Sequence, residues 1–254
     1  MASQLLDQPF AAHTPIPEQL WGFGGVHGGL ALAIVTNSMI SGTDRPVRSV
    51  TGQFLRPTRA EIVVAVDPDD ERVGRVTQVR SGSVWSGDQR SIRAVSVLGT
   101  HSRDAASMAP AMPSVPRPED CAVYDVPVPF GRSIELRPTD DARPYAGRSD
   151  AVLTAWIRLR DDDTPIDLAR LIMLSDALAP SYSATVTEML VVPTVELNLR
   201  PSAALAGADS PWLLVHATTT SVSSDGWVAE HIDTFSPSGA HLGAADQLRV
   251  IRQV

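Results

Sequence analysis

The residue type best suited to acid–base chemistry in this sequence is a histidine in a glycine-rich segment. His27 lies in the run Gly-Gly-Val-His-Gly-Gly at 24–29, directly before a long apolar stretch. Histidine changes its protonation state near neutral pH, so it could serve there as a general base. The small residues around it let the backbone approach another part of the protein closely. No acidic partner stands out in the first half of the chain, which favours a role for His27 in the structure or in an acyl pocket.

The basic residues exclude several classes of enzyme. All 21 of them are arginine, so no lysine is present for a Schiff base, for pyridoxal phosphate attachment or for a phosphate-binding loop. The chain also lacks the Gly-x-Ser-x-Gly turn of serine hydrolases and the His-Glu-x-x-His motif of zinc proteases. Its six histidines have no metal-binding spacing. We therefore expect neither a metal nor a redox cofactor.

Length and charge limit the possible partners. The 254 residues are 43% hydrophobic, enough for one large or two small domains with proper cores. A net charge of −8, with arginines scattered among acids, leaves no basic stripe for nucleic acid. No segment approaches the ~20 apolar residues that span a membrane, and the N-terminus lacks the basic region of a secretory signal. We expect a cytoplasmic protein that binds neither nucleic acid nor membrane. The single cysteine, Cys121, cannot form an internal disulfide.

Two short segments far apart in the chain resemble each other. Phe-Leu-Arg-Pro at 54–57 and Asn-Leu-Arg-Pro at 198–201 each end an apolar run typical of a strand. Each follows, at a similar distance, an apolar segment typical of a helix. A helix followed by a strand that ends in Leu-Arg-Pro, occurring twice, predicts two fused copies of one fold unit.

The elements that must position any site follow the same plan in both halves. The apolar run through Ile40 predicts a helix that is buried on all sides. A second helix is expected to begin at Thr164-Pro165 and to end at Pro180. Prolines crowd the segment between the halves, which favours an extended connection. Strands are predicted at 47–55, 61–66, 72–80, 89–98, 133–138, 151–159, 191–199, 212–221, 226–236 and 244–252.

Short motifs cover nearly the whole chain. They are the glycine-rich run at 24–29, the strand 50–57, Ile-Glu-Leu-Arg-Pro at 134–138, Trp-Ile-Arg at 156–158, Leu-Ser-Asp at 174–176, Pro-Thr-Val-Glu-Leu at 193–197, and Gln247. In these motifs and in their order, the sequence resembles the double hotdog acyl-CoA thioesterases of the acyl-CoA thioesterase II-like group. The fold implied is α+β, with a hotdog unit at 1–106, a proline-rich linker at 107–131 and a second hotdog unit at 132–254.

The resemblance implies hydrolysis of the thioester that joins an acyl group to coenzyme A, without a cofactor beyond the CoA of the substrate. Members of this family position a water with an Asp, a Ser or Thr, and a Gln. Matched by motif, these residues are Asp176 in the second helix, Thr194 at the start of the next long strand, and Gln247 on the last strand. A carboxylate on a buried helix needs hydrogen-bond partners, and a threonine hydroxyl and a glutamine amide would supply them while holding a water. Asp176 would then be the general base.

Other interpretations stay open at this point. The chain could be a non-catalytic acyl-thioester-binding protein that kept the fold, or a hotdog hydratase or dehydratase that depends on His27. Asp225 and Glu230 are interpreted as a turn acid and a strand-surface acid. Because a hotdog sheet has edges and a face that need covering, we also expect a homo-oligomer. The sequence leaves open the acyl chain length and the choice between a CoA and a carrier-protein thioester.

Overall fold

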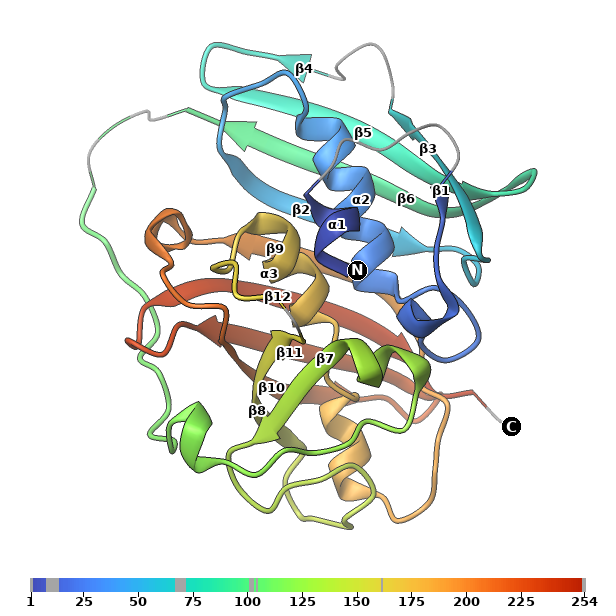
Figure 1. The fold of residues 1–254 in the computed structure, drawn as a ribbon, viewed down its shortest axis with the longest axis vertical. Helices are drawn as coiled ribbons and strands as arrows, with labels where there is room; N and C mark the ends of the chain where they lie inside the picture. Colours follow the sequence, from blue (N-terminus) through green and yellow to red (C-terminus); the bar gives the residue numbers. More distant parts are fainter. Residues whose placement is uncertain are drawn as a thin grey trace.

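A computed structural model describes residues 2–7, 14–66, 72–100, 103, 105–160 and 162–252 (Figure 1). Two of the three α-helices in these residues, at 28–40 and 168–175, lie against one face of a long, curved antiparallel sheet (Figure 1). The helices and 3₁₀ helices are α1 (Ala2–Leu6), η1 (Glu18–Leu20), α2 (Gly28–Ile40), η2 (Pro118–Asp120), η3 (Pro129–Ser133), α3 (Leu168–Ser175), η4 (Ser181–Thr185) and η5 (Ala203–Gly207). None of the helices in these residues is long and apolar enough to cross a membrane.

The strands of the two halves form one continuous sheet. They are β1 (Thr14–Pro15), β2 (Val47–Phe54), β3 (Glu61–Val66), β4 (Arg72–Val73), β5 (Thr77–Ser86), β6 (Gln89–Gly99), β7 (Ile134–Pro138), β8 (Val152–Leu159), β9 (Thr194–Pro201), β10 (Leu213–Val222), β11 (Trp227–Phe235) and β12 (His241–Val250). The order across the sheet is β1-β3-β5-β6-β2-β9-β12-β11-β10-β8-β7, and β4 pairs with β5. The predicted strand at 72–80 is therefore two strands, β4 and β5.

The strand order repeats about the centre of the sheet. Outward from the middle, β2, β6, β5, β3 and β1 of the first half mirror β9, β12, β11, β10 and β8 of the second. The two strands with the repeated Leu-Arg-Pro are the central pair, because Val50 of β2 pairs with Leu199 of β9 in antiparallel register. The repeat predicted from the sequence thus corresponds to two copies of one unit that join through their equivalent strands.

Helix α2 runs through the core of the first half, as predicted. Leu30 to Val35 are all fully buried, so successive residues on every side of the helix avoid water. On the sheet beneath it, Leu32 packs directly on Gly52. A Cβ built on Gly52 would lie 2.7 Å from the Leu32 side chain, so a larger residue would not fit there. The side chain of Asn37 donates to the carbonyl of Leu6 at 2.8 Å and holds α1 beside α2.

Helix α3 is shorter than the sequence predicts. It begins after Asp167, whose carboxylate accepts the N–H of Arg170 at 2.8 Å as an N-cap, and not at Thr164-Pro165. It ends at Ser175, so that Asp176 is the C-cap residue and lies just outside the helix. The predicted start was wrong because a second N-cap candidate, Asp167, follows Thr164. The predicted end was wrong because Pro180 sets only the last position that a helix could reach, and α3 ends before it.

The proline-rich connection between β6 and β7 packs against the sheet of the second half. Trp156 donates from its ring nitrogen to the carbonyl of Pro116 at 2.8 Å. Trp156, Leu214 and Cys121 form a small cluster that is separate from the main core around α3. Since neighbours such as Ile157 and Leu213 belong to the main core, the connection covers the face of the sheet turned away from α3.

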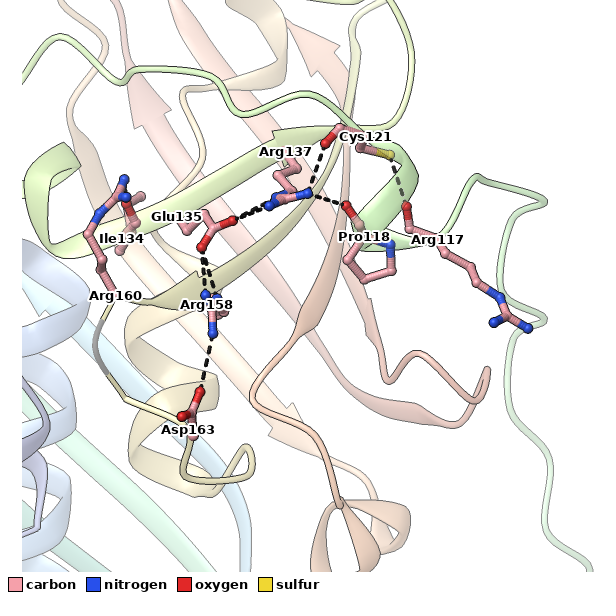
Figure 2. Close-up of polar contacts among 9 residues, drawn as sticks. All are labelled: Arg117, Pro118, Cys121, Ile134, Glu135, Arg137, Arg158, Arg160 and Asp163. Carbon is pink, nitrogen blue, oxygen red and sulfur yellow. Dashed lines mark hydrogen bonds and ion pairs between the residues drawn. The ribbon is translucent and has the colours of Figure 1, made fainter.

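An arginine at the sheet edge anchors the end of this connection (Figure 2). Arg137 on β7 donates to the carbonyl oxygens of Pro118 at 2.9 Å and Cys121 at 3.1 Å. The same guanidinium donates to Glu135 at 2.7 Å, and Glu135 also accepts from Arg158 of β8 at 2.8 Å. These contacts position the chain where it turns around β7 toward the helix side of the sheet.

Candidate active site

A cavity of about 410 Å³ lies where the two halves and the connection meet. Most of its walls are apolar. The first half contributes residues near the start of α2, such as Gly28, and the end of β2, such as Phe54. The second half contributes Asp176 and Thr194, and the connection contributes a wall that includes Val128.

The three residues predicted to act together meet at the carboxylate of Asp176. Gln247 donates its side-chain N–H to Oδ1 at 2.9 Å, and the Thr194 hydroxyl donates to the same oxygen at 3.4 Å. Oδ2 accepts the backbone N–H of Gly29 at 2.8 Å. Asp176 and Thr194 line the cavity, whereas Gln247 contacts the carboxylate without lining it. The geometry therefore brings all three residues together and adds a donor from the first half.

The ends of the two helices explain why a carboxylate can lie at this position. The C-terminus of α3 carries a partial negative charge that disfavours Asp176 there, and the N-terminus of α2 carries a partial positive charge that favours it. The Asp176 side chain is 9% exposed, so it needs these donors in place of water. The site is thus shared between the halves, although the predicted residues all come from the second.

Two glycines allow α2 to approach Asp176 this closely. A Cβ built on Gly29 would lie 2.8 Å from Cβ of Asp176 and 2.9 Å from the carbonyl oxygen of Met173. A Cβ on Gly28 would lie 3.1 Å from Oδ2 of Asp176 and 2.9 Å from the ring of Phe54. The close backbone approach expected from the glycine-rich run is this contact between the start of α2 and the end of α3.

His27 is the N-cap residue of α2 and contacts Asp176. Its Nδ1 accepts the N–H of Leu30 at 3.2 Å, and Nε2 lies 3.1 Å from the carbonyl oxygen of Asp176. Its ring stacks on Phe130 with the centroids 3.9 Å apart. Burial lowers the pKa of His27 below the ordinary histidine value, with Asp176 partly opposing the shift. In the neutral ring Nδ1 must keep its lone pair for Leu30, so the proton is on Nε2 and Nε2–H donates to Asp176.

Strand geometry positions the other two residues. Thr194 is the first residue of β9, and Gln247 lies on the neighbouring β12 opposite Leu197. Gln247 is 2% exposed, and its Oε1 has no hydrogen-bond partner among the described residues. The sequence of β12 does not decide whether Gln247 is buried or exposed. The packing of α3 over one face of the sheet decides which side of β12 is buried.

The structure corrects the interpretation of Glu230. It is buried on β11 and not at the strand surface, and it accepts from Arg249 at 2.8 Å and from the N–H of Ser181 at 2.5 Å. Asp225, in contrast, lies exposed in a turn as expected. Arg249 lines the cavity and was not predicted at all. Its position two residues after Gln247 on one strand is the signal that could have identified it, since such residues share a face.

The described residues contain no group of three or more His, Cys, Asp or Glu side chains that could hold a metal ion. The expectation that the protein uses neither metal nor cofactor stays a prediction, as does the expected homo-oligomer. The boundaries predicted for the two units and the linker also stay predictions.

The repeated strand order, with one central helix in each half, defines a double hotdog protein. Two family models match the sequence: the acyl-CoA thioesterase N-terminal domain over residues 17–102 and the acyl-CoA thioesterase C-terminal domain over residues 104–251. The chain belongs to the acyl-CoA thioesterase family and is a thioester hydrolase. The resemblance found in the sequence motifs is thereby confirmed.

Solved structures support the same fold. A hotdog-fold protein of unknown function from Alicyclobacillus acidocaldarius is 23% identical with a TM-score of 0.83, over 95% of this chain and 93% of the other. A putative thioesterase II from Thermobifida fusca YX is 21% identical with a TM-score of 0.79, over 95% and 92%. An acyl-CoA thioesterase II from Mycobacterium marinum is 21% identical with a TM-score of 0.72, over 100% and 99%. No curated protein sequence matches the chain. The α+β double hotdog fold is confirmed.

Proposed function

We propose that this protein hydrolyses acyl-CoA to a free fatty acid and CoA with a water positioned by Asp176, Thr194 and Gln247. The observation that carries the proposal is the convergence of Thr194 and Gln247 on one oxygen of Asp176, at the wall of an apolar cavity. Such a cavity suits an acyl chain, and the carboxylate is the single acid among its lining residues.

The hydrogen-bond capacity of Asp176 leaves room for the water. A carboxylate has about four acceptor sites on its two oxygens. Thr194, Gln247 and the N–H of Gly29 occupy three of them. A water that donates to the fourth would be held on the cavity side, where Asp176 is accessible.

The proposed reaction has two stages. Asp176 takes a proton from the water as the water oxygen attacks the thioester carbonyl carbon, which gives a tetrahedral intermediate. The intermediate then collapses, the carbon–sulfur bond breaks, and the sulfur takes the proton back from Asp176. The products are a free acid and CoA with its thiol, and the carboxylate is restored for the next turnover.

The contacts of His27 argue against the hydratase or dehydratase alternative. Both ring nitrogens are occupied, Nδ1 by the N–H of Leu30 and Nε2 by the carbonyl oxygen of Asp176. A general base needs a free lone pair directed at the substrate, and neutral His27 has none. A cap for α2 and a support for Asp176 are roles that these contacts can fill.

Turnover measurements test the proposal. Thiol release should be measurable with the purified protein for at least one of a short, a medium and a long acyl-CoA. Asp176→Asn should lower kcat on the order of 10²- to 10⁴-fold, because the amide cannot accept the proton. Asp225→Asn, which changes an exposed acid in a turn, is the matched control and should keep normal activity. Unchanged turnover in Asp176→Asn, or acyl-CoA binding without any turnover in the unmodified protein, would contradict the proposal.

A further inference from the structure

Arg249 is a buried arginine in the wall of the cavity. It lies on β12, two residues after Gln247, and is 5% exposed. Its Nε donates to Glu230 at 2.8 Å, which is the one hydrogen bond that it forms with the described residues. The cavity wall is otherwise mostly apolar, so a guanidinium at this place is unusual for a site that only needs to hold an acyl chain.

The partner of Arg249 is itself held firmly. Glu230 accepts the N–H of Ser181 at 2.5 Å, and the Ser181 hydroxyl lies 2.8 Å from that of Thr219. Because both oxygens of Glu230 are engaged, the carboxylate that accepts from Arg249 is fixed in place. The Nε of Arg249 is therefore positioned before any ligand enters.

The two terminal nitrogens of Arg249 remain available. A guanidinium has five N–H donors, and the bond to Glu230 uses only the one on Nε. Neither nitrogen is among the buried side-chain atoms that lack a partner in the described residues, and Arg249 lines the cavity, so a group inside the cavity can accept from them. The other arginines that line the cavity differ: Arg143 donates to the carbonyl oxygens of Asp140 and Ala142, while Arg56 and Arg252 are exposed.

Arg249 lies beside the proposed reaction centre. It is the cross-strand partner of Thr194, at a shift in the strand register, and both residues line the cavity. The Thr194 hydroxyl in turn reaches the carboxylate of Asp176. The lowered pKa of His27 agrees with this proximity, because burial is its main cause and the positive charge of Arg249 adds to it.

We propose that Arg249 binds the carbonyl oxygen of the acyl thioester through its terminal nitrogens. The inference rests on the proposed function and adds a residue to it. As the water attacks, negative charge develops on this oxygen, and a fixed cationic donor stabilises it more than it stabilises the neutral carbonyl. Arg249 would thus add to the partial positive charge at the N-terminus of α2. The substrate would lie with its carbonyl carbon near Asp176 and its carbonyl oxygen toward Arg249.

A binding experiment tests this role without depending on turnover. Two CoA analogues with the same acyl chain are compared by calorimetry: a ketone in which a methylene replaces the sulfur and the carbonyl is kept, and a thioether that lacks the carbonyl. The proteins compared are the unmodified protein and the double variant Glu230→Gln, Arg249→Met. The double variant keeps an acceptor for the N–H of Ser181, and it leaves neither a buried carboxylate without its arginine nor a buried guanidinium without its carboxylate.

The ketone should bind about 10- to 100-fold more weakly to the double variant than to the unmodified protein, as expected for a lost hydrogen bond from a charged donor. The thioether should bind equally to both. Equal effects on the two analogues, or no effect on the ketone, would overturn the assignment, and so would an unmodified protein that does not prefer the ketone. Failure of the proposed function would be seen separately, as normal turnover in Asp176→Asn.

Discussion

Asp176 depends on donors from distant parts of the chain. Gly29 lies at the start of α2, Thr194 begins β9, and Gln247 lies near the end of β12. The bond from Gln247, at 2.9 Å, is shorter than the one from Thr194, at 3.4 Å. Because longer hydrogen bonds are weaker, Gln247 holds the carboxylate more tightly, and the Thr194 hydroxyl is freer to turn toward a water.

His27 supports a prediction about pH. Burial lowers its pKa, so at pH values just below the ordinary value of about 6.5 the unfolded chain binds a proton that the folded protein does not. The stability that His27 contributes is therefore present above pH ~6.5 and declines as the pH falls toward the folded pKa. Lowering the pH from 7.5 to 5 should therefore lower the melting temperature more in the unmodified protein than in His27→Asn. Asparagine is chosen because its side chain can still cap α2 but does not titrate.

Thermal unfolding followed at a series of pH values checks this. The pKa of His216 is also lowered by burial, but His216 is present in both proteins and so cancels in the comparison. If the plots of melting temperature against pH were parallel for the two proteins, the pKa of His27 would be the same in the folded and the unfolded chain, which would contradict the prediction.

At the scale of the elements, the packing of α2 against α3 determines the site. The start of α2 meets the end of α3 backbone to backbone, and the neighbouring wall comes from the connection, where Phe130 stacks on His27. A segment that the prolines mark as a mere crossing is therefore also part of the cavity. Arg137 anchors that segment, so the sheet edge and the cavity wall are structurally linked.

The contact between these helices can be tested with Gly29→Ala. The new Cβ would meet Cβ of Asp176 and the backbone carbonyl of Met173 within 3 Å, so the helices must separate. We expect a loss of about 1–3 kcal/mol in the free energy of unfolding, as for an overpacked core. The gain in helix propensity, at most about 1 kcal/mol, does not offset it. Turnover should also fall, because the separated helices would no longer let the backbone N–H at position 29 donate to Asp176.

Gly207→Ala is the control for this prediction, since nothing lies within 4 Å of a Cβ at that position. Denaturant unfolding and kcat are measured for both variants. Gly29→Ala with normal stability and turnover would mean that the helices tolerate the extra methyl group.

At the scale of the whole molecule, the two hotdog units share one sheet and one core. The central ladder runs from the pair Val50 and Leu199 to the pair Gln53 and Glu196. Residues of α2 and α3 belong to the same cluster of buried side chains. Neither half can unfold without exposing the core and the central strand of the other.

The protein should therefore unfold in one cooperative transition. Differential scanning calorimetry should give a single peak whose calorimetric enthalpy equals the van't Hoff enthalpy. Two resolved transitions, or a van't Hoff enthalpy well below the calorimetric one, would show instead that the halves unfold independently.

The sequence contained much of this arrangement because its signals are local or repeated. The apolar run of α2 and the two Leu-Arg-Pro endings follow from short-range patterns, and the motif order indicated Asp176, Thr194 and Gln247. Helix ends were less accurate, as α3 shows, because competing N-cap residues lie close together in the chain. Glu230 was assigned to the surface for a similar reason, since an acid on a strand is usually exposed.

The amino-acid sequence alone determined the kind of fold, the duplication and the residue types of the site. Only the tertiary structure decided that Asp176 is held by the first helix of the opposite half, that the connection forms a cavity wall, and that Arg249 is buried beside Thr194. The physical reason is that local patterns encode secondary structure and exposure on average. Contacts between segments far apart in the chain depend on how the helices and the sheet pack together.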